Sequence, residues 1–262
     1  ILLQISLLLS DTYFLFWNLC AKKSRIVLKM CGISGQINFS SNRNIYVKPL
    51  NQVHRGPDNY GEYISQNKNV LFFHNRLSII DTSSKSNQPF FDSSGRYVIT
   101  FNGVIYNFVE LKHELKSKGV NFKSDGDTEV LLEVYKMYGV DGLKKLNGMF
   151  AFAIYDNQDE SVIIARDRVG EKPLYYSLNN DIFVFSSELK TLNINKKINT
   201  ESLNFYLAHG YTPRTESLFS GINKLEPGNF IQINLKTKTV DFYVLDKFSN
   251  PLYINQDYAH GY

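Results

Sequence analysis

The globular part of this chain opens with Met30-Cys31-Gly32-Ile33-Ser34-Gly35. Removal of an initiator Met ahead of a small residue would leave Cys31 with a free α-amine. Such an amine has a typical pKa of about 7.7 to 8.0, so it can take the proton of its own thiol and later return one to a leaving group. A single residue would then supply both nucleophile and base. Taken alone, a Cys at the start of a strand is more often a small buried hydrophobic residue.

Length and composition are those of an ordinary globular protein. The 262 residues are 43% hydrophobic and 21% charged, which excludes collagen-like, low-complexity and wholly disordered chains. The formal net charge is +4, and residues 1–30 carry +3 of it, with four Lys and Arg against one Asp, which leaves +1 for the remainder. We therefore expect no basic surface for nucleic acid.

The chain has two cysteines, Cys20 and Cys31. Neither lies in a ligand-like pattern, so the sequence excludes a disulfide framework and a zinc site, and it predicts no metal site. Scarce cysteines suit a reducing compartment, and we expect a cytoplasmic protein.

Residues 1–19 are apolar but are interrupted by Gln4, Asp11 and Asn18. A secretory signal would need a positive region before the apolar run and small residues at a cleavage site, and both are missing. A membrane anchor has sufficient length, although Asp11 near its centre makes that costly. We favour a third interpretation, in which residues 1–30 are a leader or upstream translation outside the fold and Met30 is the true start.

Short β-branched and aromatic runs follow residue 31, and turn-like segments at 156–159 and 178–181 join several of them. This arrangement favours hairpins and an antiparallel sheet. The expected strands are residues 32–39, 70–73, 97–101, 149–155, 161–165, 173–177, 182–185, 230–235 and 239–244.

Two helices are expected between these strands. The first starts at Asn107, with Glu110 as its capping-box partner, and is closed by Gly119. The second covers residues 128–138 and is ended by Gly139. Strands at both ends with helices between them describe an α+β layered domain, and no further element is expected after Phe248.

Motif-like stretches also follow in order behind residues 30–35. They are His54-Arg55-Gly56-Pro57-Asp58, Arg76-Leu77-Ser78-Ile79-Ile80-Asp81, Gln88-Pro89, Phe101-Asn102-Gly103-Val104-Ile105-Tyr106-Asn107, Ser124-Asp125-Gly126-Asp127-Thr128-Glu129, Gly148-Met149-Phe150-Ala151-Phe152-Ala153, Ala165-Arg166-Asp167-Arg168-Val169-Gly170-Glu171-Lys172-Pro173-Leu174-Tyr175-Tyr176 and Ser186-Ser187-Glu188-Leu189-Lys190. Their order resembles the class II glutamine amidotransferases, which are N-terminal nucleophile hydrolases, and most closely the glutaminase domain of glutamine-dependent asparagine synthetases.

The resemblance implies the four-layer αββα sandwich of that superfamily over residues 31–245. It also implies that an N-terminal cysteine attacks the side-chain amide of L-glutamine, releases ammonia and leaves a glutamyl thioester that water hydrolyses. The nucleophile would be Cys31, and the Asn102 side chain with the Gly103 N–H would stabilise the negative oxygen of the intermediate. Without the resemblance, Asn-Gly after a strand is simply a good turn.

Recognition of a free amino acid adds two further residues to the implied site. A guanidinium can bind a carboxylate with two parallel bonds, which fits Arg76, and Asp127 would hold the ammonium. The alternatives are a surface ion pair for Arg76 and a helix N-cap for Asp127. The family usually has Glu where this chain has Val104, so a carboxylate near the amine site is missing.

Other charged residues in these stretches are expected to be structural. The turn at residues 54–58 should brace the site, and the segment between Cys31 and His54 should hold only a shortened helix. A solvated cluster on a loop is the expectation for Asp167, Arg168 and Lys172.

Asparagine synthetases continue into an ATP-dependent domain, and nothing in this sequence matches it. The glutaminase step needs no cofactor, so ATP and Mg are expected only for that domain, with residues 246–262 as a truncated linker toward it. An ammonia-accepting synthetase domain or subunit would be the partner. The alternative is a non-catalytic relic, or a module that binds glutamine or packs against a partner, because Cys31 is not N-terminal in this chain.

Overall fold

The structure is a computed structural model that describes residues 30–40, 52–179, 181–192 and 194–245. The expectations for the leader and for the end of the chain lie outside these residues, as does most of the segment where a shortened helix was expected.

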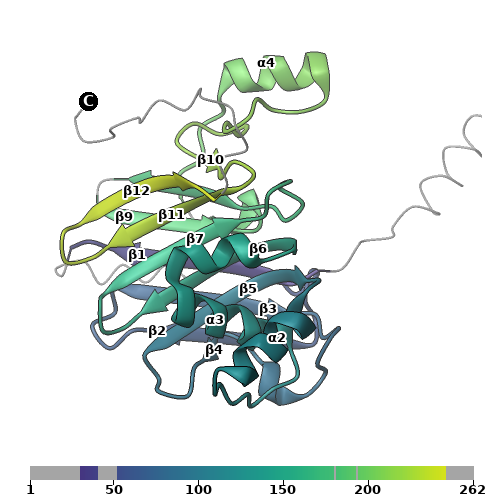
Figure 1. Ribbon diagram of the computed structural model, residues 1–262. Helices are drawn as coiled ribbons and strands as arrows, with labels where there is room; N and C mark the ends of the chain where they lie inside the picture. The colour runs from purple at the N-terminus through teal and green to yellow at the C-terminus, as the bar shows by residue number, and fades with distance from the viewer. Residues whose placement is uncertain (1–29, 41–51, 180, 193, 246–262) are drawn as a thin grey trace, which may run out of the picture.

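Two antiparallel six-stranded sheets form the body of the protein (Figure 1). The first sheet has the order β10-β8-β9-β1-β3-β2 and the second the order β12-β11-β7-β6-β5-β4. The first consists of β1 (Gly32–Asn38), β2 (Asn59–Ile64), β3 (Val70–Arg76), β8 (Tyr175–Asn179), β9 (Ile182–Ser186) and β10 (Asn223–Lys224). The second consists of β4 (Phe90–Phe91), β5 (Tyr97–Ile105), β6 (Gly148–Asp156), β7 (Ser161–Arg166), β11 (Asn229–Asn234) and β12 (Thr239–Val244).

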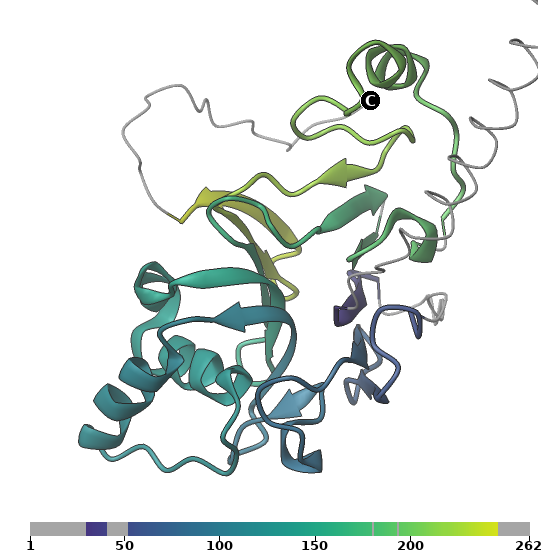
Figure 2. The same cartoon turned by 90° about the vertical axis from the view of Figure 1, so that its right-hand side faces the viewer.

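Helices α2 (Phe108–Ser117) and α3 (Asp127–Tyr138) cover the outer side of the second sheet, so that helices and sheets form successive layers (Figure 2). Helix α4 (Thr200–His209) stands apart from the sheets in both views. The short 3-10 helices are η1 (Ser84–Ser86), η2 (Gly139–Lys145) and η3 (Leu189–Thr191).

Alternate residues of the strands divide the hydrophobic core into two clusters, because successive strand side chains point to opposite faces. In β5, Ile99 and Phe101 pack toward helix α3. Val98, on the other face of β5, packs between the sheets with Ile33 of β1 and Phe72 of β3. The space between the sheets is therefore apolar in its interior, and polar side chains on these faces gather at one end.

The predicted strands and the hairpins at 156–159 and 178–181 are confirmed. The second helix ends where expected, at Gly139, whose φ of 60° is a conformation that glycine tolerates. The predicted capping box is wrong, because the Asn107 side chain hydrogen-bonds to Lys145 O and Asn147 N and not to a main-chain N–H of helix α2. Strands β2, β4 and β10 and helix α4 were not expected.

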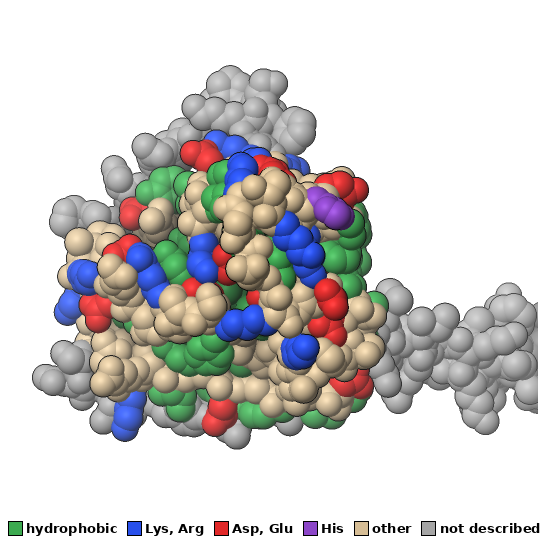
Figure 3. Space-filling model, turned by 60° about the horizontal axis from the view of Figure 1, so that its bottom comes forward, with side chains coloured by type: hydrophobic (Ala, Val, Ile, Leu, Met, Phe, Trp, Pro, Cys, Tyr) green, Lys and Arg blue, Asp and Glu red, His purple; other side chains and the backbone are tan. Residues whose placement is uncertain are grey.

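Lys and Arg side chains are interspersed with Asp and Glu side chains on the face shown in Figure 3. Within the part of the chain that the structure describes, none of the helices has the length and apolar character needed to cross a bilayer.

Candidate active site

Cys31 and Arg76 are brought together by the register of the first sheet. Gly32 of β1 pairs with Asn75 of β3, and one more step of the same antiparallel register places Cys31 opposite Arg76. Ile33 lies between the sheets, so alternation points Cys31 toward the same space. The nucleophile candidate and the guanidinium therefore share one end of the inter-sheet space.

The thiol of Cys31 is half-buried and contacts the loop after β3. Leu77 N–H donates to its Sγ at 3.3 Å, and Sγ lies 3.6 Å from Leu77 O. Burial raises the pKa of the thiol, and Asp127 acts in the same direction, whereas the bond from Leu77 and the charges of Arg76 and Arg55 oppose them. A thiol with a raised pKa needs a base before it can act as a nucleophile.

Asn102 reaches the same space from the second sheet. Thr100, two residues earlier in β5, donates its hydroxyl to Phe73 O of the first sheet, so the face shared by Thr100 and Asn102 points between the sheets. Asn102 is 1% exposed, and its Nδ2 has no hydrogen-bond partner among the described residues. A buried donor without an acceptor is unusual, and it is available to a ligand.

The main-chain N–H of Gly103 points away from β6. Phe150, its register partner, uses its carbonyl to accept from Asp167 N on the β7 side. Gly103 must therefore direct its N–H to the opposite edge of β5. The neighbouring groups on that edge are occupied, because Phe101 N donates to Gln88 at 2.6 Å and Ile105 N donates to Asp127 at 2.9 Å.

A side chain at position 103 would not fit. An added Cβ would lie 2.2 Å from Met149 O and 2.7 Å from the Phe150 Cα. Gly103 thus permits close packing against β6 and leaves its N–H beside the unpartnered amide of Asn102.

Asp127 is the first residue of α3 and is buried. Its Oδ2 accepts the bond from Ile105 N, and the preceding Gly126 occupies the N-cap position, so the helix begins one residue earlier than expected. Burial raises the pKa of Asp127 to about 6, against the bonds that it accepts. The carboxylate lies close enough to affect the Cys31 thiol.

Arg76 is buried, and it is not the surface ion pair that the sequence left open. Its Nη1 donates to Ser83 O at 2.8 Å and to Asn87 Oδ1 at 2.7 Å, and its Nη2 donates to Asp81 O. These bonds use three of the five N–H groups of a guanidinium. The two others, one of them on Nε, have no acceptor among the described residues.

A family model for the glutamine amidotransferase domain matches residues 30–244. The chain belongs to this family. Among its relatives, the glutamine-hydrolyzing asparagine synthetase 1 of Bacillus subtilis is 40% identical over 210 residues, which are 76% of this chain and 33% of the relative. The putative glutamine-hydrolyzing asparagine synthetase 2 of Methanocaldococcus jannaschii is 35% identical over 241 residues, which are 82% of this chain and 46% of that protein. This amidotransferase domain thus spans less than half of either relative.

The glutamine phosphoribosylpyrophosphate amidotransferase of B. subtilis has the same fold. It superposes with a TM-score of 0.56 at 19% identity and covers 82% of this chain and 49% of the other. The predicted fold, with paired sheets of the N-terminal nucleophile type, is thereby confirmed.

The turn before β2 holds the main chain of Cys31, as a bracing turn would. Arg55 Nε donates to Cys31 O at 2.9 Å, and His54 Nε2 lies 2.8 Å from Glu188 Oε1. Gly56 allows this turn to approach β3, because an added Cβ would lie 2.2 Å from Asn75 O.

The expectation of a solvated cluster at Asp167 and Lys172 is wrong. Asp167 is fully buried, and Lys172 is 6% exposed. The carboxylate of Asp167 accepts the main-chain N–H groups of Phe150, Val169, Glu171 and Lys172 at 3.0 to 3.1 Å. A buried carboxylate requires such partners. The third member, Arg168, donates to Leu146 O and Lys144 O.

The sequence also gave no role to His74, which lies on the inter-sheet face of β3 and is fully buried. Its Nε2 lies 3.0 Å from Phe101 O, which can only accept, so Nε2 carries the proton. Burial lowers the pKa of His74 to about 4, aided by the charge of Arg76. The neutral ring leaves Nδ1 as an acceptor without a described partner.

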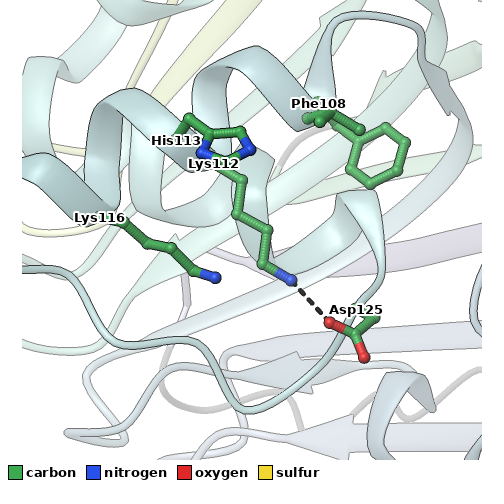
Figure 4. A pocket seen from close by; sticks show the side chains of 6 residues that line it. Phe108, Lys112, His113, Lys116 and Asp125 are labelled. Carbon is green, nitrogen blue, oxygen red and sulfur yellow. Dashed lines mark hydrogen bonds and ion pairs between the residues drawn. The ribbon is translucent and has the colours of Figure 1, made fainter.

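A separate surface pocket lies beside α2, lined by its side chains and Asp125 (Figure 4). Its lining includes Phe108, Lys112 and Asp125, and the Lys112 Nζ is 2.9 Å from the Asp125 carboxylate. None of the five predicted site residues lines this pocket, so it is not the candidate active site.

Proposed function

We propose that this domain hydrolyses L-glutamine to glutamate and ammonia through a thioester on Cys31. The observation that carries the proposal is the pair of adjacent donors at the end of β5, Asn102 Nδ2 and Gly103 N–H, both without a described acceptor. They lie at the same end of the inter-sheet space as the thiol. Two fixed donors near a nucleophile are what a tetrahedral oxyanion requires.

The reaction begins when the α-amine of Cys31, free of residue 30, takes the thiol proton as Sγ bonds to the side-chain carbonyl carbon of glutamine. The carbonyl oxygen becomes an oxyanion that accepts from Asn102 and Gly103. The α-ammonium then gives its proton to the amide nitrogen, the carbon–nitrogen bond breaks and ammonia leaves. Water attacks the resulting thioester, and glutamate and the thiol are released.

Recognition of the free amino acid is assigned to Arg76 and Asp127. The two N–H groups that Arg76 does not use in the loop at 81–87 suit a carboxylate. The buried carboxylate of Asp127 suits an ammonium. Val104, on the same face of β5 as Asn102, offers no charge, and we infer weaker glutamine binding for this reason.

The ammonia acceptor is proposed to be aspartate, activated by an ATP-dependent synthetase domain or subunit that also needs Mg. The support for this step is the identity of 35% and 40% to proteins named as asparagine synthetases. The product would then be asparagine. We propose that the protein acts in the cytoplasm.

The test is glutamate release from L-glutamine by the polypeptide that begins at Cys31. We expect turnover for this form and none for Cys31→Ala or for a form that retains Met30, because an acylated nitrogen cannot act as the base. Equal activity of Cys31→Ala and the wild type would refute the proposal. Glutamine binding without turnover in the form that begins at Cys31 would support the alternative of a non-catalytic binding module.

A further inference from the structure

Lys172 is a buried ammonium with an unsuitable partner. It is 6% exposed, and the described partner of its Nζ is the thioether sulfur of Met30 at 3.2 Å. A thioether is a weak acceptor. Asp167 and Glu171 act on this charge, but no carboxylate among the described residues bonds to it. A buried cation without a bonded carboxylate is unfavourable, so a lysine at this position calls for a reason other than stability.

The loop that carries Lys172 is held firmly in place. Asp167 accepts the main-chain N–H of Lys172 at 3.0 Å. Arg166 donates from Nε to Lys172 O at 2.7 Å and from Nη2 to Gly170 O at 2.6 Å. These bonds fix the main chain from which the Lys172 side chain extends to residue 30.

A second cation contacts the main chain of Cys31 itself. Arg55 is buried, donates to Cys31 O, and has an Nη2 without a described partner. Burial lowers the pKa of Lys172, and the charge of Arg55 lowers it further. The thiol of Cys31 is close enough to act on Lys172 in the opposite direction.

We propose that Lys172 is a positioning residue that keeps the α-amine of Cys31 in its neutral, proton-accepting form. The proposal rests on the proposed function, in which this amine is the base. When residue 30 is absent, the ammonium of Lys172 lies beside the place that the Met30 side chain occupied, one residue from the new amine. A nearby like charge disfavours protonation of the amine, so more of the amine is available as a base at neutral pH.

Other charges act on the same group. Arg55, Arg76 and Asp127 act on the Cys31 thiol, and Arg55, Asp167 and Glu171 act on Lys172. By the sign of their charges, the two arginines would favour the neutral amine as Lys172 does, and the three carboxylates would favour its protonation. The Asp167 carboxylate is already surrounded by four N–H donors. Lys172 contacts residue 30 itself, and for this reason we assign the effect to it.

The direct measurement is an NMR titration of the α-amine in the polypeptide that begins at Cys31. Cys31 is the single cysteine of residues 31–262, so 15N-cysteine labels this amine and no other. We expect a pKa below the ordinary value of about 7.7 to 8.0. A value at or above that range would overturn the proposal. This measurement does not depend on glutamine hydrolysis by the protein.

The variants separate charge from packing. Lys172→Met should raise the amine pKa by roughly one unit and move the acidic limb of kcat/KM to higher pH by the same amount, with activity recovered above that limb. Lys172→Arg should keep the wild-type limb. Lys144→Met removes an exposed lysine that pairs with Asp141 and should change neither.

The outcomes distinguish the two proposals. Turnover by the wild type with an unshifted amine pKa in Lys172→Met would overturn the role of Lys172 and leave the proposed function standing. A shifted amine pKa in a protein that does not hydrolyse glutamine would contradict the proposed function and retain the electrostatic role. If Lys172→Met does not fold, the test uses Lys172→Arg instead. A wild-type amine pKa below the ordinary range that Lys172→Arg retains supports the proposal.

Discussion

The carboxylate of Asp127 accepts the main-chain N–H of Ile105 at 2.9 Å and thereby joins the first turn of α3 to the end of β5. The bond places this carboxylate beside Ile105, which is three residues from Asn102 in β5. It also makes one residue responsible for a structural contact and for the proposed binding of the substrate ammonium.

The Asp127→Asn variant tests the contact with Ile105 and the proposed binding of the substrate ammonium separately. The amide oxygen can still accept from Ile105, and relief of the buried charge offsets the loss of other bonds that the carboxylate accepts, so we expect little change in the free energy of unfolding at pH 7. The KM for glutamine should rise at least about tenfold, since an ion pair is lost. Activity assays and denaturant unfolding measure the two effects, and an unchanged KM would count against the assignment.

The raised pKa of Asp127, about 6, also predicts a pH dependence for the wild type. As the pH falls through 6 the carboxylate gains a proton and loses its attraction for the ammonium, so KM should rise on the acidic side. The folded state binds this proton more tightly than the unfolded state. The contribution of Asp127 to the free energy of unfolding should therefore increase as the pH falls from about 6 toward about 4.

Asn102→Ala should affect rate rather than stability. Its Nδ2 has no described partner, so its removal costs few hydrogen bonds, whereas loss of an oxyanion donor lowers kcat by about 10²- to 10³-fold. Asn75→Ala is the matched control, because this buried side chain accepts from Gln52 N at 3.1 Å. It should lower the free energy of unfolding by about 1 to 3 kcal/mol. A reversal of the two phenotypes would contradict the proposed oxyanion site.

The contrast between these residues shows what the sequence could and could not reveal. Strand β1 and helix α3 were predictable because their apolar spacing and Gly139 are local signals. Helix α4 was not, since Ser202 is its buried residue and no apolar stripe marks it. The order of the motifs predicted roles for Cys31 and Asn102, but the partners of Arg76 and the burial of Lys172 depend on register and loop packing, which no single stretch encodes.

Val104→Glu tests the departure from the family motif. Val104 is half-buried and shares the inter-sheet face of β5 with Asn102. A carboxylate there would add an attraction for the substrate ammonium, so we expect a lower KM for glutamine and a similar kcat. Val104→Gln has the same shape without the charge and should not lower KM. Isothermal titration with Cys31→Ala protein would measure the binding change without turnover.

Asp167→Asn tests the support of the loop that carries Lys172. Oδ1 accepts from Val169 N and Glu171 N, and Oδ2 accepts from Phe150 N and Lys172 N. An amide group replaces one of these oxygens with a donor, and either orientation leaves two main-chain N–H groups facing it.

We therefore expect Asp167→Asn to lower the free energy of unfolding by about 2 to 4 kcal/mol, because buried donors lose their acceptors. Asp141→Asn, which removes the charge of a side chain that is 77% exposed, should change it by less than about 0.5 kcal/mol. Denaturant unfolding compares the two variants. Equal stability would mean that the four bonds of Asp167 do not hold the loop, and the proposed role of Lys172 beside residue 30 would then lose its structural support.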